Sequence, residues 1–467
     1  MSGQHRIENN IRLFKFVVNK DNFSIMTSLL NTKMMHPRDQ ITLVMKRIYD
    51  RVLTTTSGGN LSIKDEDGNV WITPSGVDKG LLKPSDIVCV RKDGTIIGDH
   101  NPSSEYPFHL AIYNKRPDIK AVVHAHPPGI VAFSIARQVP NTKVLPQVRS
   151  FCGEIGYAPY AMPGTEALGH SIANQFHEGV HIVIMENHGT VIGGCDISDA
   201  YQKFELLEVT AKSILYGNKL GQVTTLNDGQ IDAQLKRYSN SLPDMEQEST
   251  ELSSISREKR TEILKIVERA CKQGLMLGAY GSISTRVNEQ EFLITPDAIS
   301  KWDLTLKDIV QISHGKKGPG KHPDPSVHLH HAIYEQHPDI NAIIITQPTY
   351  LTSFAITGAK FNVRTIPETW IYLQDVQTGD FGCQFDKENG LSSMISPDSP
   401  VIILRNECTI VTGNKLLQAF DYLEVAEFSA KSLILSASLG EMIPISDNEI
   451  EELGKVMSRW KNYEWKM

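Results

Sequence analysis

The chain has no closely spaced pair of cysteines. Disulfide frameworks and thiolate zinc sites both need cysteines that cluster in the sequence. The six cysteines are instead scattered along the 467 residues: Cys89, Cys152, Cys195, Cys271, Cys383 and Cys408. This spacing argues against a disulfide-stabilised domain and against a zinc site built on thiolates. It predicts reduced cysteines that pack in a core.

Long apolar runs and an excess of positive charge are also absent. The longest apolar stretches, such as HIVIM from residue 181 and NAIIIT from residue 341, are far shorter than the roughly 20 residues of a membrane helix. The formal net charge of -7 disfavours general affinity for nucleic acid or anionic lipid. The N-terminus has basic residues but neither an uninterrupted apolar core nor a small-residue cleavage site. We therefore expect a cytoplasmic protein without nucleic-acid or membrane partners.

What the chain does contain is an internal repeat. The segments AIYNKRPDIKAVVHAHP (111–127) and AIYEQHPDINAIIITQP (332–348) share eight residues at an offset of 221. The correspondence continues in both directions with small changes of offset, from GGNLS at 58 and YGSIS at 280 to FELLEVTAKSIL at 204 and YLEVAEFSAKSL at 422. The chain is therefore expected to hold two homologous domains.

The repeat and the composition between its copies predict the domain limits. The stretch LPDMEQESTELSSISREKR from residue 242 is polar and charged, as linkers are. Each copy alternates short strands with helices, which predicts an α/β fold of two tandem three-layer α/β/α domains. The expected layout is an N-terminal extension (1–37), a first domain (38–220), a linker (221–256), a second domain (257–445) and a C-terminal tail (446–467).

Two histidines follow an apolar run in the first copy, in AVVHAHP (121–127). The β-branched Val122 and Val123 predict a strand that ends at the prolines. Side chains two residues apart on a strand point to the same face, so His124 and His126 should project side by side. Two ligands of one zinc ion need this arrangement. A pair of hydrogen-bonded core histidines is the structural alternative.

Further polar residues occur at places where strands and helices are expected to end or begin. The apolar run HIVIMENHG ends in His188 and Gly189, which predicts an imidazole on a turn where backbone can approach a ligand. The stretch NPSSEYPFH places Glu105 at an expected helix start. Three histidines leave zinc with an open coordination position, and a neighbouring carboxylate can move protons.

Six short motifs in a fixed order now identify a family. Together they cover residues 38–220 and resemble the class II aldolase and adducin family, most closely its zinc-dependent fuculose-phosphate aldolase type. The motifs are G-N-x-S (59–62), T-P-S-G (73–76), P-S-S-E (102–105), H-A-H-P (124–127), APYAMPGT (158–165) and N-H-G (187–189).

The resemblance implies roles for individual residues. His124, His126 and His188 bind one catalytic zinc ion per chain, and Glu105 transfers protons. The phosphate of the substrate is bound by the residues that match the family positions: Gly59, Asn60, Ser75, Gly76, Ser103 and Ser104. The family's aldolases also use a tyrosine after the metal-binding strand as proton donor, and the segment 137–147 contains no tyrosine.

The second copy lacks these residue types at the matching positions. Its residues are Ser282 for Asn60, Asp297 for Ser75, Ala298 for Gly76, Ser326 for Glu105, Ile345 for His124, Gln347 for His126 and Glu407 for His188. We therefore predict a degenerate second domain without metal ligands. The histidines of VHLHHAIY (327–334) lie on an expected helix, where they do not share one face.

These observations predict a zinc-dependent lyase that cleaves a phosphorylated ketose by retro-aldol chemistry through a metal-stabilised enediolate. A sugar-phosphate epimerase or dehydratase of the same fold is one alternative. A non-catalytic, adducin-like scaffold protein is the other. Because the family forms cyclic tetramers with sites at subunit boundaries, we expect a homo-oligomer in which two chains give a pseudo-fourfold ring.

Overall fold

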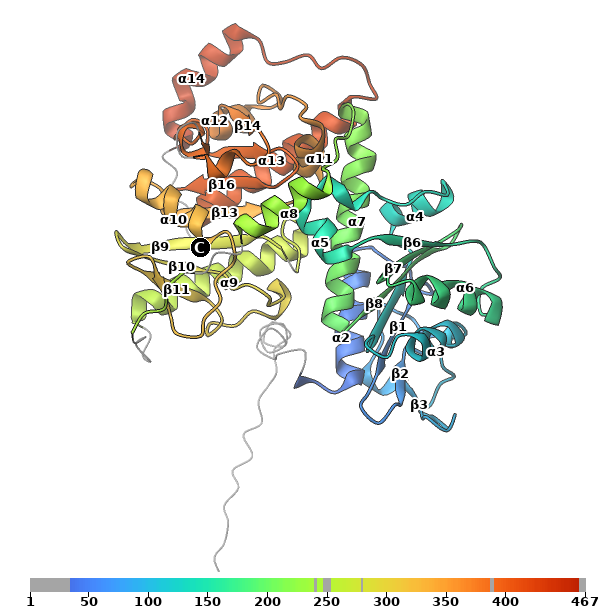
Figure 1. Cartoon of the computed structure of the whole chain (residues 1–467). Helices are drawn as coiled ribbons and strands as arrows, with labels where there is room; N and C mark the ends of the chain where they lie inside the picture. The colour runs from blue at the N-terminus through green and yellow to red at the C-terminus, as the bar shows by residue number, and fades with distance from the viewer. Residues whose placement is uncertain (1–33, 239–241, 247–252, 279, 387–389, 462–467) are drawn as a thin grey trace, which may run out of the picture.

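The computed structural model describes residues 34–238, 242–246, 253–278, 280–386 and 390–461. Residues 1–33, most of the expected N-terminal extension, lie outside the described residues. The chain forms two halves, with the first in blue to green and the second in yellow to red in Figure 1. No helix in the described part of the chain is both long and apolar enough to cross a membrane.

The first half contains one sheet of eight strands. The strands are β1 (Asn60–Lys64), β2 (Val70–Ile72), β3 (Val88–Val90), β4 (Ile96–Ile97), β5 (Ala121–Ala125), β6 (Ile155–Ala158), β7 (Ile182–Met185) and β8 (Gly189–Gly194). The helices are α2 (Pro37–Asp50), α3 (Tyr106–Lys115), α4 (Pro128–Ile135), α5 (Pro146–Cys152), α6 (Glu166–His177) and α7 (Ile197–Leu220). The strand order is β4-β3-β2-β1-β5-β8-β7-β6, and every pair is antiparallel except the parallel pair β6–β7.

The second half repeats this sheet. Its strands are β9 (Ser282–Asn288), β10 (Glu291–Ile294), β11 (Val310–Ser313), β12 (Lys316–Lys317), β13 (Ala342–Thr346), β14 (Val376–Gly379), β15 (Val401–Leu404) and β16 (Thr409–Gly413). Its helices are α9 (Ser254–Gln273), α10 (Val327–Gln336), α11 (Thr349–Thr357), α12 (Pro367–Leu373) and α13 (Leu416–Ser436). The strand order, β12-β11-β10-β9-β13-β16-β15-β14, is the same as in the first half. The prediction of an α/β fold with two tandem domains is therefore confirmed.

Alternating side chains on the central strand β5 fill two separate cores. Val123 packs in the cluster formed with α2, α4, α5 and α7. Val122 packs on the opposite face, in the cluster formed with α3 and α6. This alternation is the period of a strand that is buried on both faces, and it makes each half a layer of helices on either side of a sheet. His124 has the same parity as Val122, so its ring lies on the α3 side, against Phe108.

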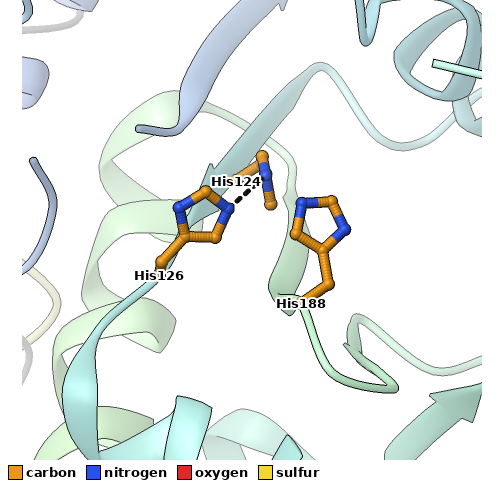
Figure 2. Close-up of side chains that lie close together, drawn as sticks. All are labelled: His124, His126 and His188. Atoms are coloured by element: carbon orange, nitrogen blue, oxygen red, sulfur yellow. Dashed lines mark hydrogen bonds between the residues drawn. The ribbon is translucent and has the colours of Figure 1, made fainter. Parts of the chain in front are cut away.

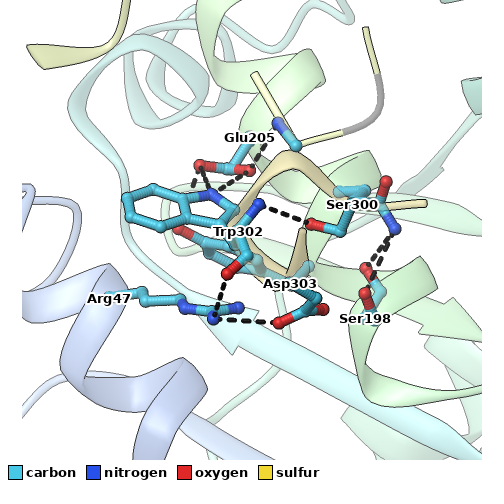
Figure 3. A network of polar contacts seen from close by, with 9 residues as sticks. Arg47, Ser198, Glu205, Ser300, Trp302 and Asp303 are labelled. Atoms are coloured by element: carbon cyan, nitrogen blue, oxygen red, sulfur yellow. Dashed lines mark hydrogen bonds and ion pairs between the residues drawn. The ribbon is translucent and has the colours of Figure 1, made fainter. Parts of the chain in front are cut away.

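The two halves are joined around the buried carboxylate of Glu205 on α7 (Figure 3). From the second half, Trp302 Nε1 donates to both carboxylate oxygens at 3.1 Å, and the backbone N–H of Gly278 donates at 3.2 Å. From the first half, Arg51 forms an ion pair with Glu205 and the Tyr201 hydroxyl donates at 3.0 Å. Loss of such partners from a buried carboxylate lowers the free energy of unfolding by several kcal/mol. The bonds to Glu205 therefore hold the two halves in one arrangement.

The segments outside the two sheets also contain helices. Within the expected linker lies α8 (Asp228–Arg237), which packs against α5. The expected C-terminal tail contains α14 (Asp447–Lys461), which packs against α12. The helix α5 precedes the parallel strand β6, and α12 precedes the parallel strand β14. Because α8 contacts α5 and α14 contacts α12, α8 and α14 occupy related positions in the two halves.

Candidate active site

The strand β5 and its exit place two imidazoles side by side. His124 is the fourth residue of β5 and is fully buried, and His126 follows directly after the strand. His124 Nδ1 lies 2.9 Å from the backbone carbonyl oxygen of Thr190 on β8. A proton on Nδ1 donated to this carbonyl leaves Nε2 unprotonated, which is the form of imidazole that binds a metal.

The third imidazole comes from the tight turn between β7 and β8. Asn187 adopts a left-handed backbone conformation with φ of 53°, and His188 follows it. The backbone N–H of His188 donates to Ser134 Oγ at 3.0 Å, and Ser134 Oγ donates to the carbonyl oxygen of Met185 at 2.6 Å. Ser134 on α4 thus fixes the turn. No sequence motif indicated this role, because it depends on α4 packing over the strand end.

The three histidine rings converge, as Figure 2 shows. One ring nitrogen from each histidine lies within 4.8 Å of the others, and this is the one group of three potential metal-binding side chains found in the described part of the chain. His124 Nε2 and His126 Nε2 are 3.1 Å apart. Figure 2 shows the His188 ring facing the other two across a small gap. A tetrahedral ion about 2.0–2.1 Å from each nitrogen requires ligand atoms about 3.3–3.4 Å apart, so small side-chain rotations would complete this donor set.

Glu105 lies beside the three imidazoles. It is the N-cap residue of α3, and its Oε2 is 3.1 Å from His124 Nε2 while its Oε1 is 3.5 Å from His188 Nε2. Asn60 Nδ2 donates to Oε2 at 2.7 Å. Oε1 is buried and accepts no hydrogen bond from the described residues. Asn60 therefore holds Oε2, the oxygen that lies next to His124, and Oε1 faces His188.

A buried chain of polar residues supports this carboxylate from behind. The oxygen of the Asn60 amide hydrogen-bonds to His109 Nε2. His109 Nδ1 and the Tyr113 hydroxyl each lie 2.7 Å from Ser62 Oγ. All four side chains belong to β1 or α3, so strand and helix packing sets the direction in which Asn60 holds Glu105.

The electrostatics of the cluster favour neutral imidazoles at His126 and His188. Burial, together with the charge of the neighbouring His124 ring, lowers the pKa of His126 to about 3 and the pKa of His188 to about 4. Burial raises the pKa of Glu105, but the charge and hydrogen bond of His124 outweigh it, so the pKa is below its usual range. Neutral imidazoles at His126 and His188 and an ionised carboxylate at Glu105 are protonation states that suit a divalent cation.

Two glycines let the backbone approach the cluster. A Cβ on Gly189 would lie 2.7 Å from the His126 ring and 2.7 Å from the carbonyl oxygen of Ala125. Gly59 has φ of +74°, and a Cβ there would lie 2.7 Å from the carbonyl oxygen of His124. Side chains at these positions would push the histidine strand away, so the glycines of the N-H-G and G-N-x-S motifs have a geometric role.

Hydrogen bonds bring the three segments of predicted phosphate-binding residues together. The start of β1 pairs with Thr73, through Thr73 N to the carbonyl of Leu61 at 3.0 Å. Ser103 N donates to the carbonyl of Thr73 at 3.1 Å, and Ser75 N donates to that of Asn101 at 3.0 Å. The segments 59–60, 73–76 and 101–105 therefore form one rim beside Glu105. On this rim Ser75, Gly76 and Ser104 are exposed, while Gly59, Asn60 and Ser103 are buried.

The second half places different residues at the same points. Strand register confirms the equivalence, because Asn60 pairs with His124 across β1 and β5 while Ser282 pairs with Ile345 across β9 and β13. Glu407, in the turn between β15 and β16, occupies the place of His188. Its carboxylate accepts hydrogen bonds from Gln147 at 2.8 Å and from Gln234 at 2.7 Å.

These donors to Glu407 come from α5 and α8. Residues of the first half and of the segment between the halves therefore cover the place in the second half that corresponds to the histidine cluster. Tyr238, which follows α8, is hydrogen-bonded to the same carboxyl group. Burial raises the pKa of Glu407 to about 7 from an ordinary value of 4.5, although the hydrogen bonds from Gln147, Tyr238 and Gln234 lower it. The carboxyl group is therefore protonated more readily in the folded chain than in the unfolded chain.

We predict a pH dependence of stability from Glu407. A carboxyl whose folded pKa is raised contributes stability that is fully present below pH 4.5 and is lost as the pH rises toward about 7. The substitution Glu407→Gln should remove this contribution, so stability should fall less between pH 5 and pH 8 than in the unchanged chain. The difference is expected to reach about 3 kcal/mol at most.

Thermal melting of both proteins across this pH range measures the effect. Glu178→Gln, at an exposed position on the first half, is the matched control. Parallel melting curves for Glu407→Gln and the unchanged chain would contradict the prediction.

Comparison with known proteins agrees with the repeat. The profile of the class II aldolase and adducin N-terminal domain matches the chain twice, over residues 39–215 and 261–434. The chain belongs to this family. Each match contains one complete eight-stranded sheet, so the predicted family and its tandem arrangement are confirmed.

Curated relatives of this class II aldolase family member act on phosphorylated compounds. The chain is 35% identical over 179 residues to L-fuculose phosphate aldolase of Methanocaldococcus jannaschii, which covers 38% of this chain and 95% of that protein. It is 33% identical over 185 residues to 3-oxo-tetronate 4-phosphate decarboxylase of Haemophilus influenzae, which covers 38% of this chain and 88% of that protein. It is 33% identical over 208 residues to 5-deoxy-D-ribulose 1-phosphate aldolase of Bacillus thuringiensis, which covers 43% of this chain and 94% of that protein.

Proposed function

We propose that the chain is a zinc-dependent lyase that cleaves a phosphorylated ketose by a retro-aldol reaction. The convergence of His124, His126 and His188 beside the carboxylate of Glu105 carries this proposal. The aldolase relatives, whose named substrates are phosphorylated sugars, support the reaction and the substrate class.

The donor set suits a divalent cation. His124, His126 and His188 would hold it through ring nitrogens, which favours zinc over magnesium or calcium because the latter prefer oxygen ligands. When bound, the cation supplies a Lewis acid that stabilises negative charge on the oxygens of the ketose. The backbone carbonyl of Thr190 and the turn held by Ser134 keep two of the three rings in place.

Glu105 exchanges a proton with the substrate. When the carbon–carbon bond of the ketose breaks, its electron pair stays on the fragment that carries the ketone. The hydroxyl group on the other fragment loses its proton to water as it becomes the aldehyde carbonyl. The carboxylate of Glu105 takes up a proton from water and delivers it to the carbon that holds the electron pair, and in the synthetic direction the carboxylate removes the same proton. The hydrogen bond from Asn60 holds Oε2 beside His124 and leaves Oε1 without a donor beside His188.

The rim beside Glu105 would bind the phosphate of the substrate. We assign this role to its backbone N–H groups and hydroxyls, because a phosphate can be held by such donors without many basic side chains. The residues are Gly59, Asn60, Ser75, Gly76, Ser103 and Ser104. The hydrogen bonds that join the three segments support a common site.

We further propose that the catalytic domain spans 38–220 and the degenerate domain 257–445, and that two chains close a ring. Within one chain, α5 of the first half contacts the second-half position through Gln147. The equivalent helix of the second half is α12, which would make the same contact with the histidine site of another chain. Light scattering should therefore report a dimer of chains; a stable monomer would contradict the ring.

A substrate panel tests the reaction. Purified protein with zinc would be given L-fuculose 1-phosphate, 5-deoxy-D-ribulose 1-phosphate and 3-oxo-tetronate 4-phosphate, and release of aldehyde and of carbon dioxide would be measured separately. Aldehyde release from a ketose 1-phosphate supports the aldolase. Carbon dioxide release alone supports decarboxylation, the second candidate, which the 33% identity to the Haemophilus influenzae decarboxylase favours. No turnover of any substrate, with zinc bound, would contradict both.

A further inference from the structure

The second half retains a cavity at the position that corresponds to the histidine cluster. Its volume is about 170 Å³, and it lies between the end of β13, the turn after β15 and the first-half helix α5. Gln347, Glu407 and Gln147 line it from these three elements. At roughly 30 Å³ for each water molecule of the liquid, the volume corresponds to about six waters, which is the size of a small organic molecule.

The charge of this cavity is opposite to what a phosphate needs. Where the first half has the serines of its phosphate rim, the second half has Asp297 and Asp324, and both line the cavity. Asp324 Oδ1 accepts hydrogen bonds from the backbone N–H and the hydroxyl of Ser326 at 3.0 and 2.7 Å. Burial raises the pKa of the Asp324 carboxyl, and the charge of the buried Lys301 lowers it in part. The described residues that line the cavity include no lysine, arginine or histidine.

Two glutamines that line the cavity each have a buried amide oxygen with no hydrogen-bond donor among the described residues. Gln347 is 6% exposed, and its Nε2 donates to the backbone carbonyl of Glu407 at 2.8 Å, which leaves Oε1 without a partner. Gln147 donates through Nε2 to the Glu407 carboxylate at 2.8 Å, and its Oε1 is likewise buried without a partner. Buried acceptors without donors are costly, so these oxygens indicate a ligand that donates hydrogen bonds.

We propose that this cavity binds a small organic ammonium ion that also carries hydroxyl groups. The ammonium group has three donors and a positive charge, which match the amide oxygens of Gln347 and Gln147 and the carboxylates of Asp297 and Asp324. The carboxylates repel phosphorylated compounds, so this ligand differs in class from the substrate of the first half. Binding here does not depend on the lyase activity proposed above.

Serinol and glycerol test the proposal as a matched pair. They have the same number of non-hydrogen atoms and differ in one ammonium group that replaces one hydroxyl. Isothermal titration calorimetry on the full chain at pH 7 should show serinol binding at least about tenfold more tightly than glycerol. Dihydroxyacetone phosphate is the ketone fragment that cleavage of a ketose 1-phosphate would release in the first half. An excess of it should not displace serinol.

Substitutions locate the binding. Asp297→Asn removes one carboxylate from an exposed position, so the variant should fold and should bind serinol about tenfold more weakly. Gln347→Leu removes an acceptor and should also weaken binding; its melting temperature shows whether it folds. Asp339→Asn, an exposed carboxylate on the same half and away from the cavity, is the control that should bind serinol normally.

Three results would overturn the proposal. The first is that serinol does not bind the full chain, or binds no better than glycerol. The second is that Asp297→Asn binds serinol as tightly as Asp339→Asn does. The third is that dihydroxyacetone phosphate displaces serinol, which would place the serinol site in the histidine cluster.

Discussion

Replacement of His124 by alanine is expected to abolish both metal binding and turnover. His124 is fully buried, its Nδ1 is held by the carbonyl of Thr190, and its Nε2 lies 3.1 Å from His126 and 3.1 Å from Glu105. Without it only two imidazole ligands remain, and catalytic zinc sites use three protein ligands. Zinc content should fall from one ion per chain to near zero, and kcat/KM should fall by at least about 10³-fold, because Lewis-acid stabilisation is worth several kcal/mol.

Metal analysis of the purified variant and a kinetic assay on the substrate found in the panel measure these changes. His177→Ala is the matched control, because His177 is exposed at the end of α6 and lies outside the cluster. Its zinc content and kcat should be unchanged. A His124→Ala protein that keeps one zinc ion per chain would show that the metal is held elsewhere. Zinc-free protein that keeps full turnover would contradict the proposed chemistry.

Replacement of Glu105 by glutamine is expected to separate metal binding from turnover. The glutamine side chain has the same shape and keeps an oxygen for the hydrogen bond from Asn60 Nδ2. The three histidines remain, so zinc content should stay at one ion per chain. Glutamine cannot exchange a proton at neutral pH, so kcat should fall by about 10²–10⁴-fold, the usual contribution of a general acid or base.

The test measures zinc content and kcat on the same preparation. Ser326→Ala is the control from the second half, where Ser326 holds the position that Glu105 holds in the first. This variant should keep both zinc and kcat. Unchanged kcat in Glu105→Gln would remove Glu105 from its proposed role, whereas loss of zinc in that variant would show that its carboxylate is needed to bind the metal.

The period of the strand made part of the site predictable. Because His124 and His126 are two residues apart at the end of a strand, the sequence alone indicated that both rings lie on one face. The structure places His124 on β5 and His126 just beyond it, with the rings 4.7 Å apart between centroids. Local pattern is sufficient here because it fixes the direction of neighbouring side chains.

The contribution of His188 could not be derived in this way. It lies 62 residues after His126 in the chain, and only the antiparallel pairing of β5 with β8 brings its turn beside the other two rings. The family motifs pointed to it, but the reason is the register of the sheet. Ser134 and the carbonyl of Thr190 carried no signal, because a backbone acceptor has no side-chain signature and a serine on a helix is common.

The sequence by itself determined the duplication, the α/β class and the loss of ligand residue types in the second copy, because these depend on residue identity and on periodicities that each segment carries alone. Only the tertiary structure decided that a carboxylate and three imidazoles meet, and that first-half side chains close the cavity of the second half. Such contacts join residues far apart in the chain. They form through sheet register and the packing of helices between the halves, which no single segment specifies.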